Sequence, residues 1–285
     1  MKLLLLKISR FIPDRIYINL MFYKHFKRKV NFKNPKTLNE KVQWLKINDR
    51  KEEYTNLSDK YKVREYISNV LGEEYLIPLI GVWNSVDEIK YDDLPEQFVL
   101  KCNHDSKSVY ICKDKSKFDF NDVKSKIEKK LKINAYWYGR EWQYKNIKPC
   151  IIAEKYMVDE SQVELKDYKI MCFNGKADSI MFCYNRHNGD TRFKFFDLDW
   201  NELPYIRDEK NPDKDYIVPK PKSLNKMIEI AEILSKGLDF VRIDLYEISG
   251  KIYFGEITLH NASGLDKDIT LEADYLLGEK LKLPL

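Results

Sequence analysis

Apolar side chains recur every three or four residues in the first part of the chain, a spacing typical of amphipathic helices. Residues 34–49 follow this pattern after Thr37, a residue type that often caps the start of a helix. Residues 58–72 repeat it, with Ser58 as the expected cap and Gly72 as the expected end. The first part of the chain is therefore predicted to be helical.

Runs of β-branched and aromatic residues replace the helical spacing after residue 75. The expected strands lie in "LIPLIGVW" (76–83), "QFVLKCN" (97–103), "SVYICKD" (108–114), "PCIIAEKYM" (149–157) and "RFKFFDLDW" (192–200). Residues 120–132 and 223–238 return to helical spacing. Residues 167–186 are predicted to form two strands joined at Asn174-Gly175, a pair that favours a tight hairpin. This order of elements predicts an α+β protein with two antiparallel sheets.

A second hairpin is predicted in "DFVRIDLYEISGKIYFGEITLHN", residues 239–261. We expect "ISG" to form a three-residue loop in which Gly250 adopts a left-handed conformation. In that register Arg242 faces Glu256 across the two strands. Asp244 and Glu256 are then diagonal neighbours on one face, with their backbones about 7–8 Å apart.

Alternate residues of this hairpin point to opposite faces of the sheet. One face is apolar and is predicted to join the core; it carries Val241, Ile243, Leu245, Ile257 and Leu259. The other face collects Arg242, Asp244, Glu256 and Thr258. A pairing slip of one residue would place the two acids on opposite faces.

Two carboxylates that converge from neighbouring strands can hold a divalent cation such as Mg²⁺. Arg242 beside them would suit the phosphates that accompany such a metal. The alternative is a cross-strand salt bridge between Arg242 and Glu256, with Asp244 in solvent. The hairpin alone leaves both interpretations open.

Composition and charge restrict the classes of protein that fit the chain. With 50 basic and 45 acidic residues the net charge is +5, and no Arg-rich stripe appears, so a nucleic-acid partner is not expected. A mild attraction to anionic substrates or an anionic membrane is compatible with this charge. The five cysteines are scattered without zinc spacing, which favours reduced thiols and a cytoplasmic location.

Residues 1–29 superficially resemble a signal peptide, but the run of four leucines is short and no cleavage site follows it. No stretch approaches the length of a membrane-spanning helix. Two interpretations of this segment stay open. It is either an amphipathic segment that touches the cytoplasmic face of a membrane, helped by "KHFKRK" (24–29), or a helix packed on its own domain.

Further polar residues stand where predicted strands begin or end. Lys101 is followed by the polar loop "NHDSKS" (103–108), an arrangement that can place a loop over nucleotide phosphates. Glu154 could present an acid to an adenine edge, and Asp167 opens the next strand, where ribose hydroxyls could be met. Each of these residue types is common on its own.

In this order and spacing the residues resemble the ATP-grasp superfamily, and more narrowly its TupA-like branch, named for teichuronopeptide biosynthesis. The blocks that carry the resemblance are "KCNHDSKSVYICKDK", "WYGREWQYKNIKPCIIAEKYM", "DYKIMCFNGK" and "FVRIDLYEISGKIYFGEIT". The resemblance implies two lobes with antiparallel sheets that sandwich ATP, preceded by a helical region. The implied boundaries are residues 1–75 for the helical region, 76–165 for the smaller lobe and 166–285 for the larger lobe.

The resemblance also implies roles for single residues. The implied ATP-binding residues are Lys101, His104, Ser106, Glu154, Lys155, Met157, Asp167 and Lys169. Lys101 would contact the α- and β-phosphates, and Glu154, Lys155 and Met157 would contact adenine. His104 would touch phosphate or else lie at the surface. The implied catalytic residues are Arg242 and Lys101. The implied ligands for one or two Mg²⁺ ions are Asp244 and Glu256.

Two departures from the branch affect these roles. Related enzymes usually have Asn two residues after the second acid, where this chain has Thr258, although Asn261 lies close by. The loop after Lys101 has few glycines, and Asp105 would repel phosphates unless it faces solvent or Lys107 compensates its charge.

The superfamily implies a reaction in which a carboxylate attacks the γ-phosphate of ATP, and an amine then displaces phosphate from the acyl phosphate. The branch implies bacterial surface polysaccharide synthesis, with a uronic acid as the carboxylate and an amino acid as the amine. The substrate-site candidates are Arg140, Trp142, His260 and Asn261. Trp142 would stack on a sugar and Arg140 would clamp a carboxylate, or both would serve packing and surface pairing.

Two other functions stay open. Asp197 and Asp199 of "FDLDW" form a DxD arrangement that could bind a metal and a sugar nucleotide, which would indicate a glycosyltransferase. Thr258 and the glycine-poor loop leave open a non-catalytic ATP-grasp-like scaffold.

Overall fold

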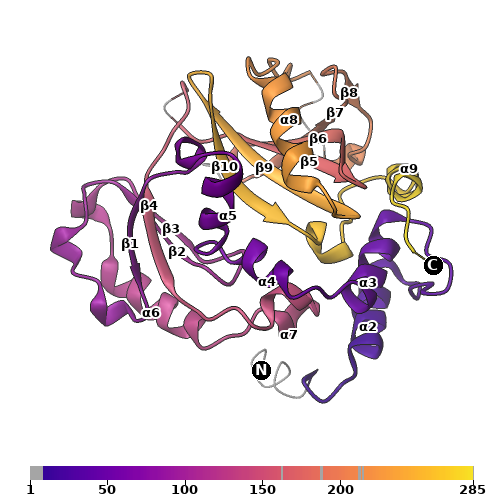
Figure 1. The fold of residues 1–285 in the computed structure, drawn as a ribbon, viewed down its shortest axis with the longest axis horizontal. Coiled ribbons are helices and arrows are strands. Elements are labelled where there is room, and N and C mark those ends of the chain that lie inside the picture. The colour runs from indigo at the N-terminus through magenta and orange to yellow at the C-terminus, as the bar shows by residue number, and fades with distance from the viewer. Residues whose placement is uncertain (1–8, 162, 187–188, 211–212, 214, 285) are drawn as a thin grey trace. The chain divides into compact units, whose positions relative to one another are not determined.

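The computed structural model describes residues 9–284 apart from 162, 187–188, 211–212 and 214. The chain forms two compact units, whose elements are labelled in Figure 1. The small unit is Lys51–Met157, and the large unit combines Met1–Arg50 with Val158–Leu285.

This division differs from the predicted regions 1–75, 76–165 and 166–285. The helices of residues 51–75 belong to the small unit, whereas the earlier helices belong to the large unit. The reason is packing: α3 (Leu38–Asn48) contacts α9 (Leu271–Lys280), which lies at the other end of the chain. A single linear cut therefore does not separate the units.

The small unit is built on a four-stranded antiparallel sheet with the strand order β1-β4-β2-β3. Its strands are β1 (Leu79–Trp83), β2 (Phe98–Cys102), β3 (Val109–Cys112) and β4 (Ile151–Lys155). Its helices are α4 (Glu53–Ser58), α5 (Val63–Val70), α6 (Phe120–Leu131) and α7 (Tyr136–Gly139). Helix α6 buries Val123 and Ile127 against one face of the sheet. By strand alternation, Lys101 and Glu154 lie on the other face.

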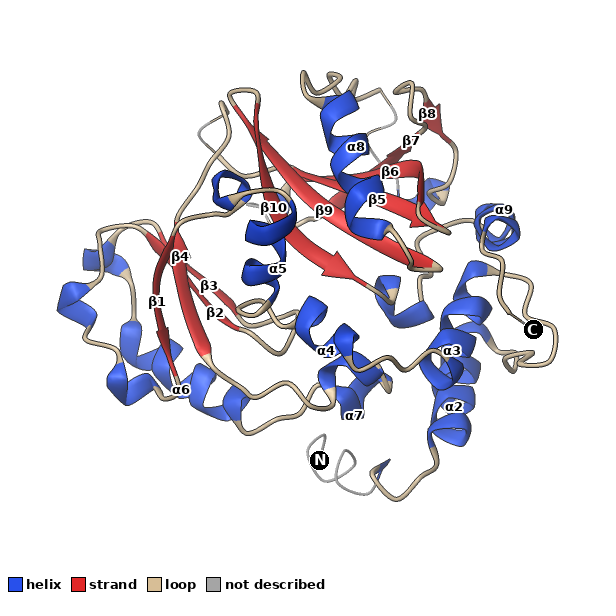
Figure 2. Ribbon diagram, viewed as in Figure 1, coloured by secondary structure: helices blue, strands red, loops and turns tan. Residues whose placement is uncertain are grey.

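The large unit is built on a six-stranded antiparallel sheet with the order β10-β9-β5-β6-β7-β8. Its strands are β5 (Asp167–Phe173), β6 (Lys176–Tyr184), β7 (Arg192–Phe196), β8 (Glu202–Leu203), β9 (Phe240–Ile248) and β10 (Lys251–Thr258). Its helices, besides α3 and α9, are α2 (Asp14–Phe26) and α8 (Leu224–Ser235). Two antiparallel sheets with helices confirm the predicted α+β class (Figure 2).

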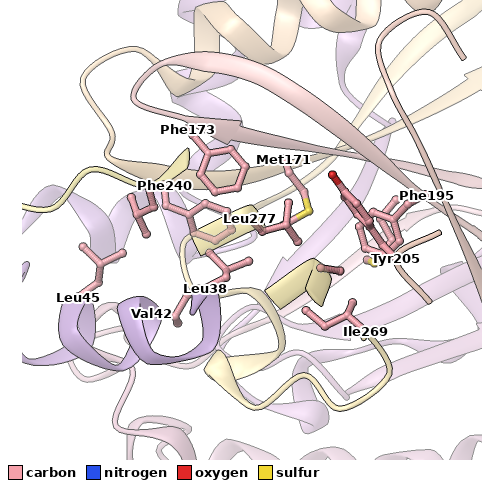
Figure 3. Close-up of a cluster of buried hydrophobic side chains, with 13 residues drawn as sticks. Leu38, Val42, Leu45, Met171, Phe173, Phe195, Tyr205, Phe240, Ile269 and Leu277 are labelled. Atoms are coloured by element: carbon pink, nitrogen blue, oxygen red, sulfur yellow. The ribbon is translucent and has the colours of Figure 1, made fainter. Parts of the chain in front are cut away.

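The two faces of the large sheet are covered differently. Helix α8 packs on β5, β6 and β9 (Figure 2). On the opposite face, Met171, Phe173 and Phe240 pack in a cluster with side chains of α3 and α9 (Figure 3). Further along β5 and β9 this same face becomes polar and carries Lys169 opposite Asp244. The change from apolar to polar along two strands creates the candidate site.

Local sequence signals set several helix boundaries. Thr37 caps α3 through a capping box with Glu40, so the predicted cap is confirmed. The prediction for Ser58 is wrong, because Ser58 ends α4. Asp59 instead accepts a hydrogen bond from the backbone N–H of Tyr61 ahead of α5. The N-cap residue of α5 itself is Lys62, whose side chain makes no capping hydrogen bond.

The hairpin between β5 and β6 turns at Asn174-Gly175, as predicted. Both residues have positive φ, 51° and 77°, and Phe173 pairs with Lys176. This is the geometry of a tight two-residue turn that asparagine and glycine accept with little strain.

The last hairpin has a shorter turn than predicted. Ile248 pairs with Lys251, so the loop is the two-residue Ser249-Gly250 and not "ISG". Gly250 has the predicted positive φ of 77°, but Ser249 has one as well, at 52°. Serine rarely adopts this conformation, which is why the sequence pattern favoured the longer loop.

A β-bulge at Gly255 sets the placement of the two acids. The shorter turn alone would shift the pairing by one residue and put Asp244 and Glu256 on opposite faces. Because the bulge adds one residue to β10, Glu256 pairs directly with Asp244. The predicted diagonal pairing is wrong, but both acids do share one face. The predicted apolar face is buried, with Val241, Ile243, Leu245, Ile257 and Leu259 in the interior.

Helix α2 follows residues 1–8 of the predicted N-terminal segment, which lie outside the described residues. The helix packs through Ile18 and Phe22 in a small cluster with Val30. One side of α2 is therefore packed on its own unit.

Candidate functional site

Asp244 lies at the centre of a buried charged cluster in the large unit. Arg242 donates to both of its carboxylate oxygens, from Nε to Oδ1 at 2.7 Å and from Nη2 to Oδ2 at 2.8 Å. Lys169 on β5 also donates to Oδ2. The alternative in which Asp244 lies in solvent is therefore wrong.

These two cations control the ionisation of Asp244. Burial raises the pKa of its carboxyl group, but Arg242 and Lys169 outweigh burial and hold the pKa below its ordinary value. Burial likewise lowers the pKa of Arg242, and the charge of Asp244 more than reverses that effect. Both groups are therefore charged at neutral pH.

Arg242 also connects the cluster to the end of β10. Its Nη2 donates to Oγ1 of Thr258 at 3.2 Å, and its Nη1 donates to Oδ1 of Asn261 at 2.5 Å. Asn261 opens the short 3₁₀ helix η8 (Asn261–Gly264). The structure thus brings together Arg242, Asp244, Thr258 and Asn261, with Glu256 paired to Asp244 across the strands.

This donor set fits a magnesium ion that is shared with a nucleotide. Asp244 and Glu256 supply carboxylates from directly paired strands, and Thr258 and Asn261 add neutral oxygens nearby. Within the part of the chain that the structure describes, no three His, Cys, Asp or Glu side chains form a group that could hold a metal ion. Mg²⁺ commonly binds through one or two carboxylates plus substrate phosphates, so two acids are sufficient.

Asp167, predicted to meet ribose, is buried at the start of β5. Its carboxylate forms an ion pair with Arg186 and lies 3.7 Å from the Lys169 ammonium. Burial raises the pKa of Tyr246, and Asp167 raises it further through charge and a hydrogen bond. Neither Arg186 nor Tyr246 was predicted, although Tyr246 follows Asp244 at strand spacing on the same face.

His260, a predicted substrate residue, is buried directly after β10. Burial lowers the pKa of its imidazole well below the ordinary value, and the charges of Lys46 and Arg50 lower it further. The ring is therefore neutral at physiological pH. The ring lies near Lys46 and Arg50 of the large unit, which stand more than 200 residues earlier in the sequence.

Glu154 in the small unit is held by two cations. Lys101 pairs with its Oε2 at 2.5 Å, and Arg64 of α5 pairs with its Oε1 at 3.0 Å. The second guanidinium nitrogen of Arg64 donates to the carbonyl of Ile77 at 2.9 Å. The structure therefore brings together the predicted Lys101 and Glu154 and adds Arg64, which no local motif in the sequence indicated.

The loop after Lys101 is folded back on its own unit. His104 is buried, and its Nε2 lies 3.1 Å from the carbonyl of Lys130, so the alternative of a surface histidine is wrong. Asp105 accepts hydrogen bonds from the hydroxyl and the backbone N–H of Ser108, at 2.6 and 3.0 Å. Ser106 is exposed.

The charge of Asp105 is compensated by residues of its own unit. Burial raises the pKa of its carboxyl group, but the hydrogen bonds from Ser108 and the charges of Lys130 and Lys60 hold the pKa below the ordinary value. Lys107, the expected compensating residue, is exposed and donates its backbone N–H to Asp105 at 3.3 Å. The lysines that reduce the repulsion expected between Asp105 and phosphates are thus Lys130 and Lys60.

The remaining predicted residues of the small unit differ in exposure. Lys155 is exposed and its backbone N–H donates to Pro78 at 2.9 Å, while Met157 is the last residue of the unit. Arg140 is fully buried, with its guanidinium 4.7 Å from the centre of the Trp137 ring. Lys145 lies over the ring of Trp142 at 4.7 Å. Both predicted substrate residues in this region are thus engaged with neighbours in the same unit.

Asp197 holds a turn after β7. It accepts hydrogen bonds from the backbone N–H groups of Asp199 and Asn201, at 3.0 and 2.8 Å, and from the Asn201 amide at 2.8 Å. The predicted strand ends at Phe196. This local role accounts for the acid at Asp197, whereas Asp199 is exposed.

A separate cavity of about 560 Å³ opens in the large unit. It is lined by Glu164, Lys166, Tyr184, Asn185, Asp213, Asp215 and Tyr216. None of the predicted site residues lines it. We therefore take the charged cluster, and not this cavity, as the candidate site for a nucleotide and Mg²⁺.

Comparison with known proteins identifies the class and then the family. The model of the TupA-like ATP-grasp family matches residues 40–282, so the fold is that of an ATP-grasp protein. The chain belongs to the TupA-like ATP-grasp family. A search of curated proteins finds no match.

Solved structures of ATP-grasp enzymes are distantly similar to the chain. D-alanine–D-alanine ligase from Bacillus anthracis, complexed with ATP, is 17% identical over 79% of this chain and 62% of that protein, with a TM-score of 0.44. The corresponding ligase from Helicobacter pylori is 16% identical over 86% of this chain and 69% of that one, with a TM-score of 0.40. A RimK domain ATP-grasp protein from Sphaerobacter thermophilus is 10% identical over 80% of this chain and 69% of that one, with a TM-score of 0.41. The chain thus spans less than two thirds of the Bacillus ligase.

Proposed function

We propose that this chain is an ATP-dependent carboxylate–amine ligase that joins an amino acid to a uronic-acid carboxylate during bacterial surface polysaccharide synthesis. The observation that carries the proposal is the buried cluster of Lys169, Arg242 and Asp244 beside Glu256, in a chain of the TupA-like ATP-grasp family. Such a cluster offers fixed cations for phosphate and acids for a metal. The products are the amide, ADP and phosphate.

The large unit supplies the groups for phosphoryl transfer. Arg242 is held by Asp244, Thr258 and Asn261, so its guanidinium is fixed in orientation before substrate arrives. Asp244 and Glu256 would hold Mg²⁺, which in such sites neutralises phosphate charge. Lys169 lies against Asp244 and would shift its hydrogen bond to phosphate oxygen.

The small unit contains Lys101, to which the family resemblance assigns contacts with ATP phosphates. Its ammonium pairs with Glu154 in the structure, and a phosphate group competes well for such a cation. Arg64 stays paired with Glu154 when Lys101 moves, which keeps the buried acid compensated. The adenine contacts proposed for Glu154, Lys155 and Met157 rest on the family resemblance.

The proposed substrate class rests on the resemblance to the TupA-like branch. We assign no described residue to the recognition of the nucleotide base or of the sugar. A uronic-acid carboxylate is activated as an acyl phosphate, because a free carboxylate offers no good leaving group. An amino acid then attacks through its amine. Asn261 accepts a hydrogen bond from Arg242 and is therefore the substrate candidate within the cluster, although it is buried, as are Arg140 and His260.

The glycosyltransferase alternative has less support. Asp197 uses both carboxylate oxygens to hold the turn with Asn201, so Asp197 would have to release these bonds before it bound a metal. The scaffold alternative draws its support from Thr258, since a hydroxyl is a poorer metal ligand than an amide oxygen.

A coupled assay tests the proposal. The chain is incubated with ATP, Mg²⁺, an oligosaccharide of uronic acids and a mixture of amino acids, while ADP is measured and amide products are identified by mass spectrometry. We expect ADP release that requires both acceptors. The double variant Asp244→Asn/Glu256→Gln should lose activity, and Asp197→Asn/Asp199→Asn should keep it.

The opposite pattern would favour the glycosyltransferase. No ADP release with any pair of acceptors would favour the scaffold.

A further inference from the structure

Helix α2 is apolar on two sides. Ile18 and Phe22 lie one turn apart and are buried in the large unit. Ile16, Leu20 and Tyr23 follow helical spacing on the opposite side and are 54%, 57% and 52% exposed. A helix of a globular domain usually carries polar residues on the side that faces water.

Phe11, which precedes the helix, extends this exposed apolar surface. Its side chain is 89% exposed. We refer to Phe11, Ile16, Leu20 and Tyr23 as the α2 surface. Large apolar side chains scattered singly need no explanation, but several gathered on one short helix indicate a surface that contacts something other than water.

Basic residues surround the α2 surface. Residues 10–29 contain six basic residues and one acidic residue, a net charge of +5, which equals the net charge of the whole chain. The rest of the chain is therefore electrically balanced. Arg10, Arg15, Lys24, Lys27 and Lys29 are exposed, while Arg28 pairs with Glu40.

Lys24 and Lys27 lie next to the apolar stripe. They follow Leu20 and Tyr23 by one turn each, so they share that side of the helix. Lys27 is the C-terminal cap residue of α2. Long lysine side chains at such positions can extend to headgroups while the apolar residues contact acyl chains.

We propose that the α2 surface docks on an anionic lipid membrane, with Phe11, Ile16 and Leu20 in the interface and the surrounding lysines on lipid headgroups. The charge argues against a second copy of this chain as the occupant, because a two-fold contact would bring the same basic residues together. Within the residues described, no helix is long and apolar enough to cross a bilayer, so the proposed contact is peripheral. The proposal does not depend on the ligase activity.

Vesicle sedimentation tests the docking surface. The whole chain is mixed with vesicles of phosphatidylcholine alone or of phosphatidylcholine with phosphatidylglycerol. We expect binding only to the anionic vesicles, and weaker binding as salt is raised, because exposed charges are screened.

Two variants separate the apolar and the charged contributions. Lys24→Gln/Lys27→Gln should weaken binding about 30-fold, from roughly fivefold for each basic residue near an anionic surface. Ile16→Ser/Leu20→Ser should weaken it by about tenfold or more, because their apolar area no longer leaves water. The thermal midpoint should stay unchanged in both, since the replaced side chains are exposed.

Matched controls come from the other end of the large unit. Ile217 is 86% exposed, and Lys220 and Lys222 are exposed near it. Ile217→Ser and Lys220→Gln/Lys222→Gln should leave vesicle binding unchanged. Binding that is absent, equal on neutral vesicles, or equally weakened by these controls would overturn the proposal.

A second measurement tests whether the α2 surface instead contacts a second copy of the chain. Sedimentation velocity is run on the parent and on Ile16→Ser/Leu20→Ser. A parent dimer that the variant abolishes, together with no vesicle binding, would assign the α2 surface to self-association and overturn the proposal. A parent whose oligomeric state does not change in the variant, together with anionic vesicle binding, would support it.

Discussion

Two buried carboxylates, Glu154 and Asp244, are each held by one lysine and one arginine. A buried acid that loses its only partner is strongly destabilising. With two cations, a lysine can turn to a phosphate group while the arginine keeps the acid compensated. The arrangement occurs in both units, and in the large unit Asp167 is held in the same way by Arg186 and Lys169.

Arg64 tests this idea in the small unit. Arg64→Gln leaves Glu154 with Lys101 alone, so recruitment of Lys101 by a nucleotide would leave the acid without a partner. We expect the affinity for Mg·ATP, measured by calorimetry, to fall about tenfold, as for loss of a charged hydrogen bond. Arg64→Lys should show a smaller loss.

Lys124→Gln is the matched control, because it removes an exposed pair with Asp87 in the same unit. It should change neither affinity nor stability measurably. If Arg64→Gln binds Mg·ATP as tightly as the parent, Arg64 has no role in compensating Glu154.

His260 predicts a specific dependence of stability on pH. Its pKa is lowered in the folded chain because the ring is buried and lies near Lys46 and Arg50. Below a pH of about 6.5 the unfolded chain takes up a proton at this residue and the folded chain does not. The free energy of unfolding therefore falls as the pH drops below about 6.5, by up to about 1.4 kcal/mol per pH unit.

Urea unfolding of the parent and of His260→Gln between pH 8 and pH 5 measures the contribution of His260 to the pH dependence of stability. We expect the free energy of unfolding to fall more steeply below neutral pH in the parent. Parallel curves for the two proteins would show that the imidazole titrates alike in both states.

At the scale of elements, the sequence predicted the turn of one hairpin and the other hairpin in part. Asn174-Gly175 carries the standard signal for a two-residue turn, although the pairing shifts by one residue further along that hairpin. The last hairpin has Ser249 in a conformation that serine seldom adopts and a bulge at Gly255. An isolated glycine inside a strand is a signal for a bulge that the prediction did not use, whereas serine gives no signal for its positive φ. The correct face assignment of the acids survived because the two errors in register cancelled.

Gly255 is expected to be essential for the geometry of the acids. A Cβ atom at this position would lie 2.9 Å from the carbonyl oxygen of Asp244, so the bulge would have to shift. Gly255→Ala should lower the free energy of unfolding by about 1–3 kcal/mol, a typical cost of overpacking. It should also weaken Mg·ATP binding, because Glu256 is displaced from Asp244.

Ser249→Gly in the same hairpin is the control. It removes a side chain from a position with positive φ and should leave stability unchanged or slightly increased. Thermal unfolding of both variants measures the difference. Equal stability of Gly255→Ala and the parent would mean that the bulge is not required.

For the whole molecule, contacts between distant parts of the chain were the least predictable feature. Arg64 and Glu154 are 90 residues apart, and no spacing rule connects a helix residue to a strand residue at that distance. The α3–α9 packing joins opposite ends of the chain. Acids, lysines and turns were visible in the sequence, while the partners that hold them and the boundaries of the units required the fold.

The division into units predicts how fragments behave. Residues 51–157 are contiguous and contain their own core between α6 and the small sheet. Residues 158–285 lack Leu38, Val42 and Leu45, which fill the core of the large unit (Figure 3). We expect the first fragment to unfold cooperatively by circular dichroism and the second to need residues 1–50 for folding. A folded second fragment beside an unfolded first one would contradict this division.

We propose above that the cluster around Asp244 binds ATP together with Mg²⁺. Calorimetric titration of ATP into the parent and into Asp244→Asn/Glu256→Gln, with and without Mg²⁺, measures this binding, once circular dichroism shows that both proteins are folded. We expect Mg²⁺-dependent binding by the parent that is weakened about tenfold or more in the variant, a change of at least about 1.4 kcal/mol. Equal binding by the two proteins, or no binding by the parent under any condition, would contradict it.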